Sequence, residues 1–338
     1  MIGTPEDSRD VLAQVARWQT DGLQVALITV TNTWGSSPRP VGSMLAVAAD
    51  GRFAGSVSGG CIEAAAIEEA HALISTGERK RIEYGVTDDT AWQVGLPCGG
   101  QIQVFIEPLP PVDTVRETLL ETLARNEPAV LIRDLQSGDR LLLRPDEDAC
   151  SMSADVRAHA LALLQQDTSR TLELDGRELF FQVFAPPMRL IIVGAVDIGN
   201  ALAQMAGLAG YDVCFIEPRR AFAAREPFQS RAVQSDWPDE AVRRLAPDNR
   251  TAIITLTHDP KLDDPALIEA LRSPAFYVGC LRSRRSHAAR RERLAAMGVP
   301  TADLDRLHGP VGLAIGAKSQ AEIAVSILAD LIRVRRQT

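Results

Sequence analysis

The sequence predicts an α/β protein with two domains, because the 338-residue chain changes its pattern near residue 187. From residue 187 to 338, near-continuous apolar runs such as "LIIVG", "TAIITL" and "AFYVG" alternate with helical segments. This alternation is typical of a doubly wound, Rossmann-type parallel sheet covered on both faces. Residues 1–186 combine hairpin signals with helices, which predicts a mixed α/β domain. The linker is "APPM", where two prolines interrupt helix and sheet alike.

In the first predicted helix, residues 8–21, four apolar residues share one face: Val11, Leu12, Val15 and Trp18. Next come a buried strand, "LQVALITVTNTWG", and a hairpin that turns at Asp50-Gly51. A glycine-opened helix, "SGGCIEAAAIEEAHALISTG", precedes the strands "KRIEYGV" and "GGQIQVFIEPL". Helices over "DTVRETLLETLARN" and "ADVRAHALALLQQ" follow, with hairpins at Ser137-Gly138 and Asp175-Gly176.

In the second domain, "LIIVGAVDIGNALAQMAGLAGYDVCFIEP" predicts a strand, a glycine turn, a helix and a strand that ends in Glu217. "RAVQ" predicts a short third strand, and "TAIITLTHD" and "AFYVGCL" predict two more. Helices are expected over "PALIEALRS", "SHAARRERLAAMG" and "SQAEIAVSILADLIRV". Ser319 and Glu322 form a capping-box pattern at the start of the last helix.

The composition favours a globular cytoplasmic protein. The chain is 46% hydrophobic and 24% charged, and its net charge of −8 argues against nucleic acid or anionic membranes as partners. No apolar run reaches the roughly 18 residues of a membrane span. The start, "MIGTPEDSRDVLAQ", lacks the pattern of a signal peptide. The five cysteines contain no CxxC pair, which fits a reducing compartment and excludes a zinc knuckle.

The first turn of the second domain only partly matches a dinucleotide-binding G-x-G-x-x-G pattern. Gly194 and Gly199 are present, but Val196 occupies the place of the second glycine, where the backbone must approach a pyrophosphate. Asp197 adds negative charge at the same helix start, whereas Glu217 stands where a ribose hydroxyl would bind. Two alternatives remain open for the glycines: nucleotide binding, or a role limited to the turn and to helix packing.

Other polar residues at strand ends are candidates for the same crevice, because ligands of such sheets bind beyond the carboxyl ends of the strands. His258 and Asp259 follow one strand, and Arg284 and Arg285 lie in the predicted loop after another, placed to hold a phosphate. Three further arginines are expected on a solvated helix face: Arg290, Arg291 and Arg293.

Three glycine-rich loops in the first domain carry the other candidate site residues. Their polar, glycine and cysteine residues are Ser36, Ser37 and Arg39; Ser58, Gly59, Gly60, Cys61 and Glu63; and Cys98, Gly99 and Gly100. Hydroxyls, backbone N–H groups and an arginine suit an oxyanion, and a helix start near Cys61 favours its thiolate. Each loop alone could be a simple turn, and Glu63 could be a ligand or acid–base contact or only a favourable charge at a helix start. Together the loops predict a ligand site.

Six stretches, in order and across both domains, resemble the XdhC/CoxI family of accessory factors for molybdenum hydroxylases: "GSSPRPVGSMLAV", "GSVSGGCIEAA", "GLPCGGQIQVFIEP", "LTHDPKLDDPAL", "YVGC" with "SRRSHAARRERL", and "GPVGLAIGAKSQAEIAVSILADLI". The resemblance implies an XdhC/CoxI cofactor-handling domain at 1–186 and a Rossmann-type domain at 187–338. It also implies a non-catalytic chaperone that binds molybdenum cofactor (molybdopterin) and delivers it to an apo molybdenum hydroxylase such as xanthine dehydrogenase.

By the same resemblance, Cys61 and Cys98 are the cysteines of the cofactor-handling loops, with Arg39 beside them. Apart from contacts between these thiols and molybdenum, no metal site is expected. A cysteine desulfurase is a further candidate partner, and a homodimer is the expected assembly. Two alternatives come from other classes. One is an NAD(P)-dependent oxidoreductase that uses the second domain, against which Val196 counts. The other is a metal-dependent enzyme that uses Cys61, Glu63 and His258, which lack a compact ligand motif.

Overall fold

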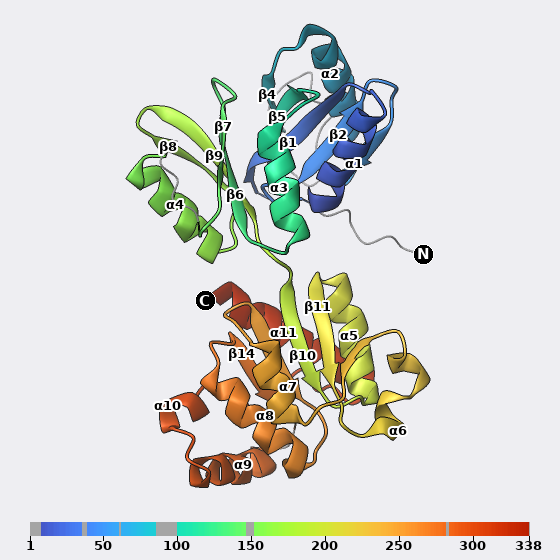
Figure 1. Cartoon of the computed structure of the whole chain (residues 1–338), viewed down its shortest axis with the longest axis vertical. Helices are drawn as coiled ribbons and strands as arrows, with labels where there is room; N and C mark the ends of the chain where they lie inside the picture. Colours follow the sequence, from blue (N-terminus) through green and yellow to red (C-terminus); the bar gives the residue numbers. More distant parts are fainter. Residues whose placement is uncertain are drawn as a thin grey trace. The chain divides into compact units, whose positions relative to one another are not determined.

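The chain divides into two compact units, Met1–Pro186 and Pro187–Thr338, each with its own sheets and core (Figure 1). The computed structural model describes residues 8–35, 39–60, 62–85, 100–146, 152–281 and 284–337, with Arg284 described by its backbone alone. No helix within these ranges is both long and apolar enough to cross a membrane.

The first sheet of the first unit is antiparallel, with the strand order β3-β2-β1-β5-β4. Its strands are β1 (Val25–Trp34), β2 (Met44–Ala48), β3 (Phe53–Gly55), β4 (Lys80–Tyr84) and β5 (Gln101–Leu109). Three helices pack on it: α1 (Ser8–Thr20), α2 (Glu63–Thr76) and α3 (Thr114–Ala124). Because side chains alternate along a strand, Ile28 of β1 faces α2, whereas Leu27 faces α1 and α3.

The predicted apolar face of the first helix is confirmed. Its four members, all buried in α1, are Val11, Leu12, Val15 and Trp18. The hairpin predicted at Asp50-Gly51 is confirmed as the turn between β2 and β3. The helix predicted after the glycine pair is α2, and it ends at Gly77, which adopts the left-handed conformation usual for a helix end.

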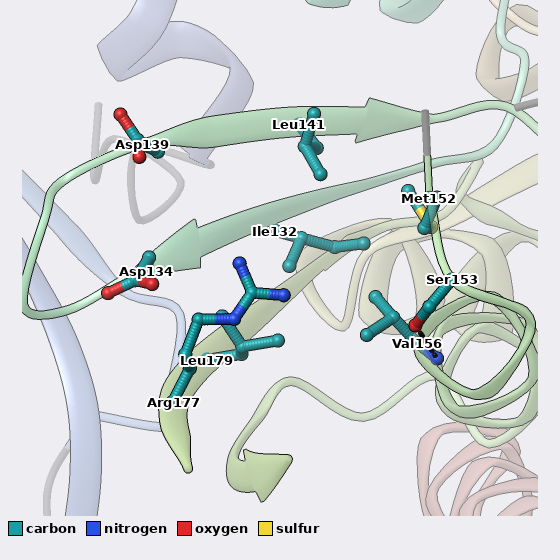
Figure 2. Close-up of a pocket in the computed structure, with 9 residues that line it drawn as sticks. All are labelled: Ile132, Asp134, Asp139, Leu141, Met152, Ser153, Val156, Arg177 and Leu179. Carbon is teal, nitrogen blue, oxygen red and sulfur yellow. Dashed lines mark hydrogen bonds between the residues drawn. The ribbon is translucent and has the colours of Figure 1, made fainter. Parts of the chain in front are cut away.

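A second antiparallel sheet of the first unit has the order β7-β6-β9-β8. It comprises β6 (Ala129–Asp134), β7 (Arg140–Leu143), β8 (Arg170–Leu174) and β9 (Arg177–Phe184), and it is covered by α4 (Ala154–Gln165). Ile132 and Leu179 of the sheet form an apolar cluster with Val156 of the helix (Figure 2). This sheet therefore has a small core of its own.

The second unit is built on the predicted parallel sheet, with the order β12-β11-β10-β13-β14-β15. The strands are β10 (Met188–Val193), β11 (Tyr211–Ile216), β12 (Ala232–Gln234), β13 (Thr251–Thr255), β14 (Tyr277–Cys280) and β15 (Leu307–His308). The helices are α5 (Asp197–Leu208), α6 (Arg220–Ala223), α7 (Pro238–Leu245), α8 (Pro260–Arg272), α9 (Arg284–Ala296), α10 (Thr301–Leu304) and α11 (Gln320–Gln337). The Rossmann-type fold is thus confirmed.

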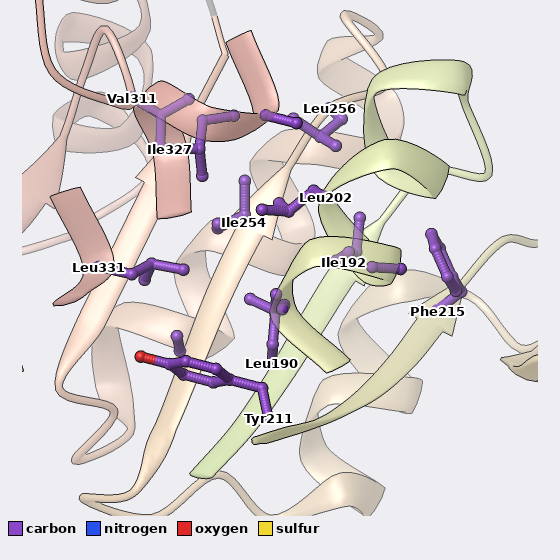
Figure 3. Close-up of a cluster of buried hydrophobic side chains, with 14 of the residues drawn as sticks. Leu190, Ile192, Leu202, Tyr211, Phe215, Ile254, Leu256, Val311, Ile327 and Leu331 are labelled. Atoms are coloured by element: carbon purple, nitrogen blue, oxygen red, sulfur yellow. The ribbon is translucent and has the colours of Figure 1, made fainter. Parts of the chain in front are cut away.

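Strand β10 is buried on both of its faces, as its apolar run predicts. Leu190 and Ile192 pack with α5 and α11 (Figure 3), whereas Ile191 and Val193 pack with α7 and α8. The predicted capping box of α11 also forms, since the Ser319 hydroxyl accepts the Glu322 N–H while the Glu322 carboxylate accepts the Ser319 N–H at 2.9 Å.

The expected solvated face of α9 is wrong for Arg290, whereas Arg291 and Arg293 remain partly exposed. The Arg290 side chain is 0% exposed and donates to Asp263 of α8 at 2.8 Å. Arg293 pairs with Asp264 of α8 at 2.9 Å, and Arg291 pairs with Asp305 at 2.6 Å. An arginine buries only with a partner for its charge, and here the partners come from other elements. The buried pairs join α8 to α9.

Replacement of Arg290 by methionine is expected to destabilise the second unit by about 3–5 kcal/mol, because it leaves the Asp263 carboxylate buried without its ion-pair partner. The melting temperature should fall by roughly 6–20 °C, as measured by circular dichroism. The matched control is Arg285→Met, at an exposed position of the same helix. Equal melting temperatures for the two variants would contradict the prediction.

Candidate functional site

The carboxylate of Glu63, in the first turn of α2, organises the loop over residues 56–60. Its Oε1 accepts the Ser56 hydroxyl at 2.7 Å and the Ser58 N–H at 2.9 Å. Its Oε2 accepts the Gly60 N–H at 2.8 Å and also the Ser58 hydroxyl. The loop closes further because the Gly59 N–H donates to the Ser56 hydroxyl oxygen at 3.0 Å. The N–H groups predicted to bind an external anion therefore already bind groups of the loop itself.

The glycine pair is required by the path of this loop. Gly59 and Gly60 have φ angles of +77° and +117°, a region that residues with a Cβ atom rarely adopt. Successive backbone amides in such a turn form a concave surface that attracts negative charge. Here the Glu63 carboxylate supplies that charge and holds the loop together.

The hydrogen bonds keep Glu63 ionised. Partial burial opposes ionisation, but the hydroxyls of Ser58 and Ser56 and the loop N–H groups outweigh it and lower the pKa of Glu63 to about 2. The carboxylate therefore carries its charge throughout the neutral range. As an acceptor with its lone pairs engaged, it suits a positioning role better than proton transfer at neutral pH.

The structure describes only part of the other two predicted loops. Arg39 is half-buried, and Gly100 is buried directly before β5. Five predicted site residues lie outside the described residues: Ser36, Ser37, Cys61, Cys98 and Gly99. Elsewhere in the described ranges, no group of three or more histidine, cysteine, aspartate or glutamate side chains is arranged to hold a metal ion.

The glycines of the turn after β10 serve close packing. A Cβ atom on Gly194, whose φ is +113°, would lie 2.8 Å from the Thr257 side chain. A Cβ atom on Gly199 would lie 3.2 Å from the Gly194 carbonyl oxygen and from the Phe215 ring. These distances support the interpretation in which both glycines allow the turn and the approach of α5 to the sheet.

Glu217 at the end of β11 is engaged by its own chain. It is fully buried, and its carboxylate accepts the Ala195 N–H at 2.9 Å and two guanidinium N–H groups of Arg219 at 2.7 Å. Burial opposes ionisation, but Arg219 and the Ala195 N–H hold the pKa of Glu217 below its ordinary value. The acceptor expected for a ribose hydroxyl is thus occupied.

The residues of this crevice do not fit a dinucleotide. Val196 is the N-cap of α5, and its N–H donates back to the Gly194 carbonyl at 3.0 Å. Asp197 forms an ion pair with Arg225 at 2.6 Å, so a carboxylate stands at the helix start where a pyrophosphate would bind.

The remaining strand-end residues have varied settings. His258 is exposed and has a φ of +62°, and the Asp259 side chain caps α8 by accepting the Lys261 N–H at 3.0 Å. The loop placement of Arg284 and Arg285 is wrong, because α9 begins at Arg284 and contains both. The helix therefore begins two residues before Ser286, where the sequence predicted its start.

Two positioning residues escaped the sequence reasoning: Ser56, which binds Glu63, and Arg219, which binds Glu217. For Ser56 a signal was present, since two serines precede a glycine pair and a glutamate within seven residues. Arg219 follows its partner by two residues, a spacing at which a side chain can fold back on the chain.

The protein is of a class with two units. The first has a glycine-rich loop held by Glu63, and the second has a Rossmann-type sheet in which Glu217 is bound by Ala195 and Arg219 of the same chain. A family model described as the XdhC Rossmann domain matches residues 190–331, and one described as the XdhC and CoxI family matches residues 18–85. The chain belongs to the XdhC and CoxI family.

Relatives cover nearly the whole chain. The molybdenum cofactor insertion chaperone PaoD of Escherichia coli (strain K12) is 29% identical over 331 residues, which is 98% of this chain and 89% of PaoD. A probable xanthine dehydrogenase subunit of Bacillus subtilis (strain 168) is 26% identical, over 94% of this chain and 95% of that protein. The crystal structure of a xanthine dehydrogenase from Bacillus halodurans shares the fold, with a TM-score of 0.72 and 23% identity over 96% of each chain.

Glu63→Gln should loosen the loop, because an amide replaces one acceptor oxygen with an N–H donor facing other donors. The lowered pKa of Glu63 means that its contribution is present above pH 4.5 and is lost as the pH falls toward 2. With solvent screening, that contribution is about 1–2 kcal/mol. Hydrogen exchange of the Ser58 and Gly60 amides at neutral pH should quicken about tenfold.

The control for this experiment is Glu68→Gln, at an exposed position of the same helix. Unchanged exchange in the Glu63 variant, or equal quickening in the control, would contradict the role assigned to Glu63.

Titration of the protein with NADH or NADPH is expected to give no saturable change in cofactor fluorescence, because Glu217, Val196 and Asp197 leave no ribose acceptor or pyrophosphate site. Saturation near one cofactor per chain would overturn this expectation.

Proposed function

We propose that the protein binds molybdenum cofactor through its first unit and delivers it to an apo molybdenum hydroxylase of the xanthine dehydrogenase type. The cofactor is cargo in this proposal, and the chain is a chaperone that catalyses no reaction of its own. The observation that carries the proposal is the loop fixed by Glu63, in a chain whose similarity to a molybdenum cofactor insertion chaperone extends over both units.

Loop rigidity supports this role. A loop whose backbone is already fixed loses little conformational freedom when a ligand binds, so more of the contact energy remains as affinity. Glu63 fixes Ser58 and Gly60, which precede Cys61 in the sequence, through contacts within the chain. In the proposal Cys61 and Cys98 contact molybdenum as thiolates, and Arg39 with Ser36 and Ser37 receives the pterin phosphate.

The start of α2 supports an ionised Cys61. The helix begins at Glu63, and the N-terminus of a helix carries a partial positive charge that stabilises a nearby thiolate. The Glu63 carboxylate has its negative charge dispersed over hydroxyl and N–H donors, so it opposes the thiolate less than a bare carboxylate would.

The partners in the proposal are a cytoplasmic apo hydroxylase and a cysteine desulfurase, with the chaperone acting as a homodimer. The relatives named for cofactor insertion and for xanthine dehydrogenase support a hydroxylase client. The net charge of −8 supports a protein partner rather than nucleic acid.

Protein produced in a host that makes molybdopterin is expected to co-purify with the pterin, whereas Cys61→Ser should retain at most about a tenth of it, because the thiolate contact is lost. Oxidation of the bound pterin to its fluorescent derivative, followed by chromatography, measures the content. Mixing the loaded protein with an apo xanthine dehydrogenase should then restore that enzyme's activity.

The matched control is Cys214→Ser, which removes a half-buried thiol of the second unit and should leave the pterin content unchanged. The proposal is contradicted if the unaltered protein contains no more pterin than the Cys61→Ser variant. Loaded protein that fails to activate the apo enzyme would limit the role to storage.

A further inference from the structure

A cavity of about 90 Å³ opens between the second sheet of the first unit and the start of α4 (Figure 2). Its floor is apolar and comes from Ile132, Leu141, Met152, Val156 and Leu179. Its polar lining consists of Asp134, Asp139, Ser153 and Arg177. The cavity lies outside both family matches, which end at residue 85 and resume at residue 190.

Arg177, at the start of β9, is the unusual member of this lining. It is exposed, and no other residue in the described parts of the chain forms a hydrogen bond or an ion pair with its guanidinium. In Figure 2 this group extends from β9 toward Asp134 and Ile132. An arginine fork at an apolar cavity suits a carboxylate, which it binds through two parallel hydrogen bonds.

The two aspartates supply the opposite charge. One oxygen of Asp134 accepts the N–H groups of Gln136 and Ser137, and one oxygen of Asp139 accepts the Ser137 hydroxyl. For the second oxygen of each carboxylate, no hydrogen bond occurs within the described ranges. These oxygens remain acceptors for a cationic donor. With one positive and two negative groups, the lining disfavours a simple anion and favours a ligand that carries both charges.

The size of the cavity limits the apolar part of that ligand. A cavity of about 150 Å³ holds benzene, which has six carbon atoms. In proportion, a cavity of about 90 Å³ holds roughly four carbon atoms. Small-molecule sites combine such an apolar floor with a few polar groups that fix orientation.

We propose that this cavity binds a free α-amino acid with a short aliphatic side chain, such as leucine or valine. The side chain fills the floor formed by Ile132, Val156 and Leu179, the carboxylate pairs with Arg177, and the ammonium group pairs with Asp134 and Asp139. The site is independent of the proposed cofactor role, since none of these residues belongs to the predicted cofactor loops.

Calorimetric titration of the full chain tests the proposal with four probes: L-leucine, L-valine, 4-methylpentanoate, which lacks the amino group, and 3-methylbutylamine, which lacks the carboxylate. Saturable binding of at least one amino acid is expected, with each analogue bound about tenfold more weakly or worse than leucine, because each loses a charged hydrogen bond. Arg177→Ala should weaken amino acid binding about tenfold or more.

The control is Arg170→Ala, an exposed arginine of β8 that does not line the cavity, and it should bind as the unaltered protein does. Melting temperatures of both variants establish that they fold. The proposal is overturned if neither amino acid saturates, if Arg177→Ala binds as well as Arg170→Ala, or if either analogue matches leucine.

Discussion

The glycine-rich loop before α2 and the glycine turn after β10 each bind a carboxylate of the same chain, and this internal pairing decides which groups of each remain available to a ligand. Glu63 gathers the amides of the loop that leads into α2, and Glu217 holds Ala195 and Arg219 beyond the ends of β10 and β11. Turn amides attract negative charge whatever its source. A tethered carboxylate is always near, so an external anion must displace it before it can bind the same amides.

The same pairing has different consequences in the two units. In the first unit it fixes the backbone of Ser58 and Gly60, which is the condition that the proposed cargo site needs. In the second unit the pairing engages Glu217, the residue that would otherwise bind a ribose hydroxyl. Arg225 pairs with Asp197 at the start of α5. Pairing of a carboxylate with backbone amides thus fixes the loop before α2 in the first unit and engages the strand-end acceptor Glu217 in the second.

Apolar spacing predicted the elements well, because burial of one face decides whether a segment such as α1 forms. It failed for Arg290, whose burial depends on Asp263, a residue of another helix that no spacing within α9 can reveal. The role of Glu63 was beyond sequence reasoning for a related reason. It depends on the path of Gly59 and Gly60, and that path exists only once the turn has formed.

The strand order of the second unit has a consequence for how the chain is made. Strand β10 lies inside the parallel sheet and is the first of its strands to be synthesised. Its neighbour β13 follows only after α5, β11, α6, β12 and α7. Pairing between such distant segments is slow, because a long loop must close first. During synthesis the apolar β10 therefore waits with one edge unpaired, in a state that is prone to aggregation. A protein proposed to act as a chaperone thus itself passes through a state in which an apolar strand lacks one of its partners.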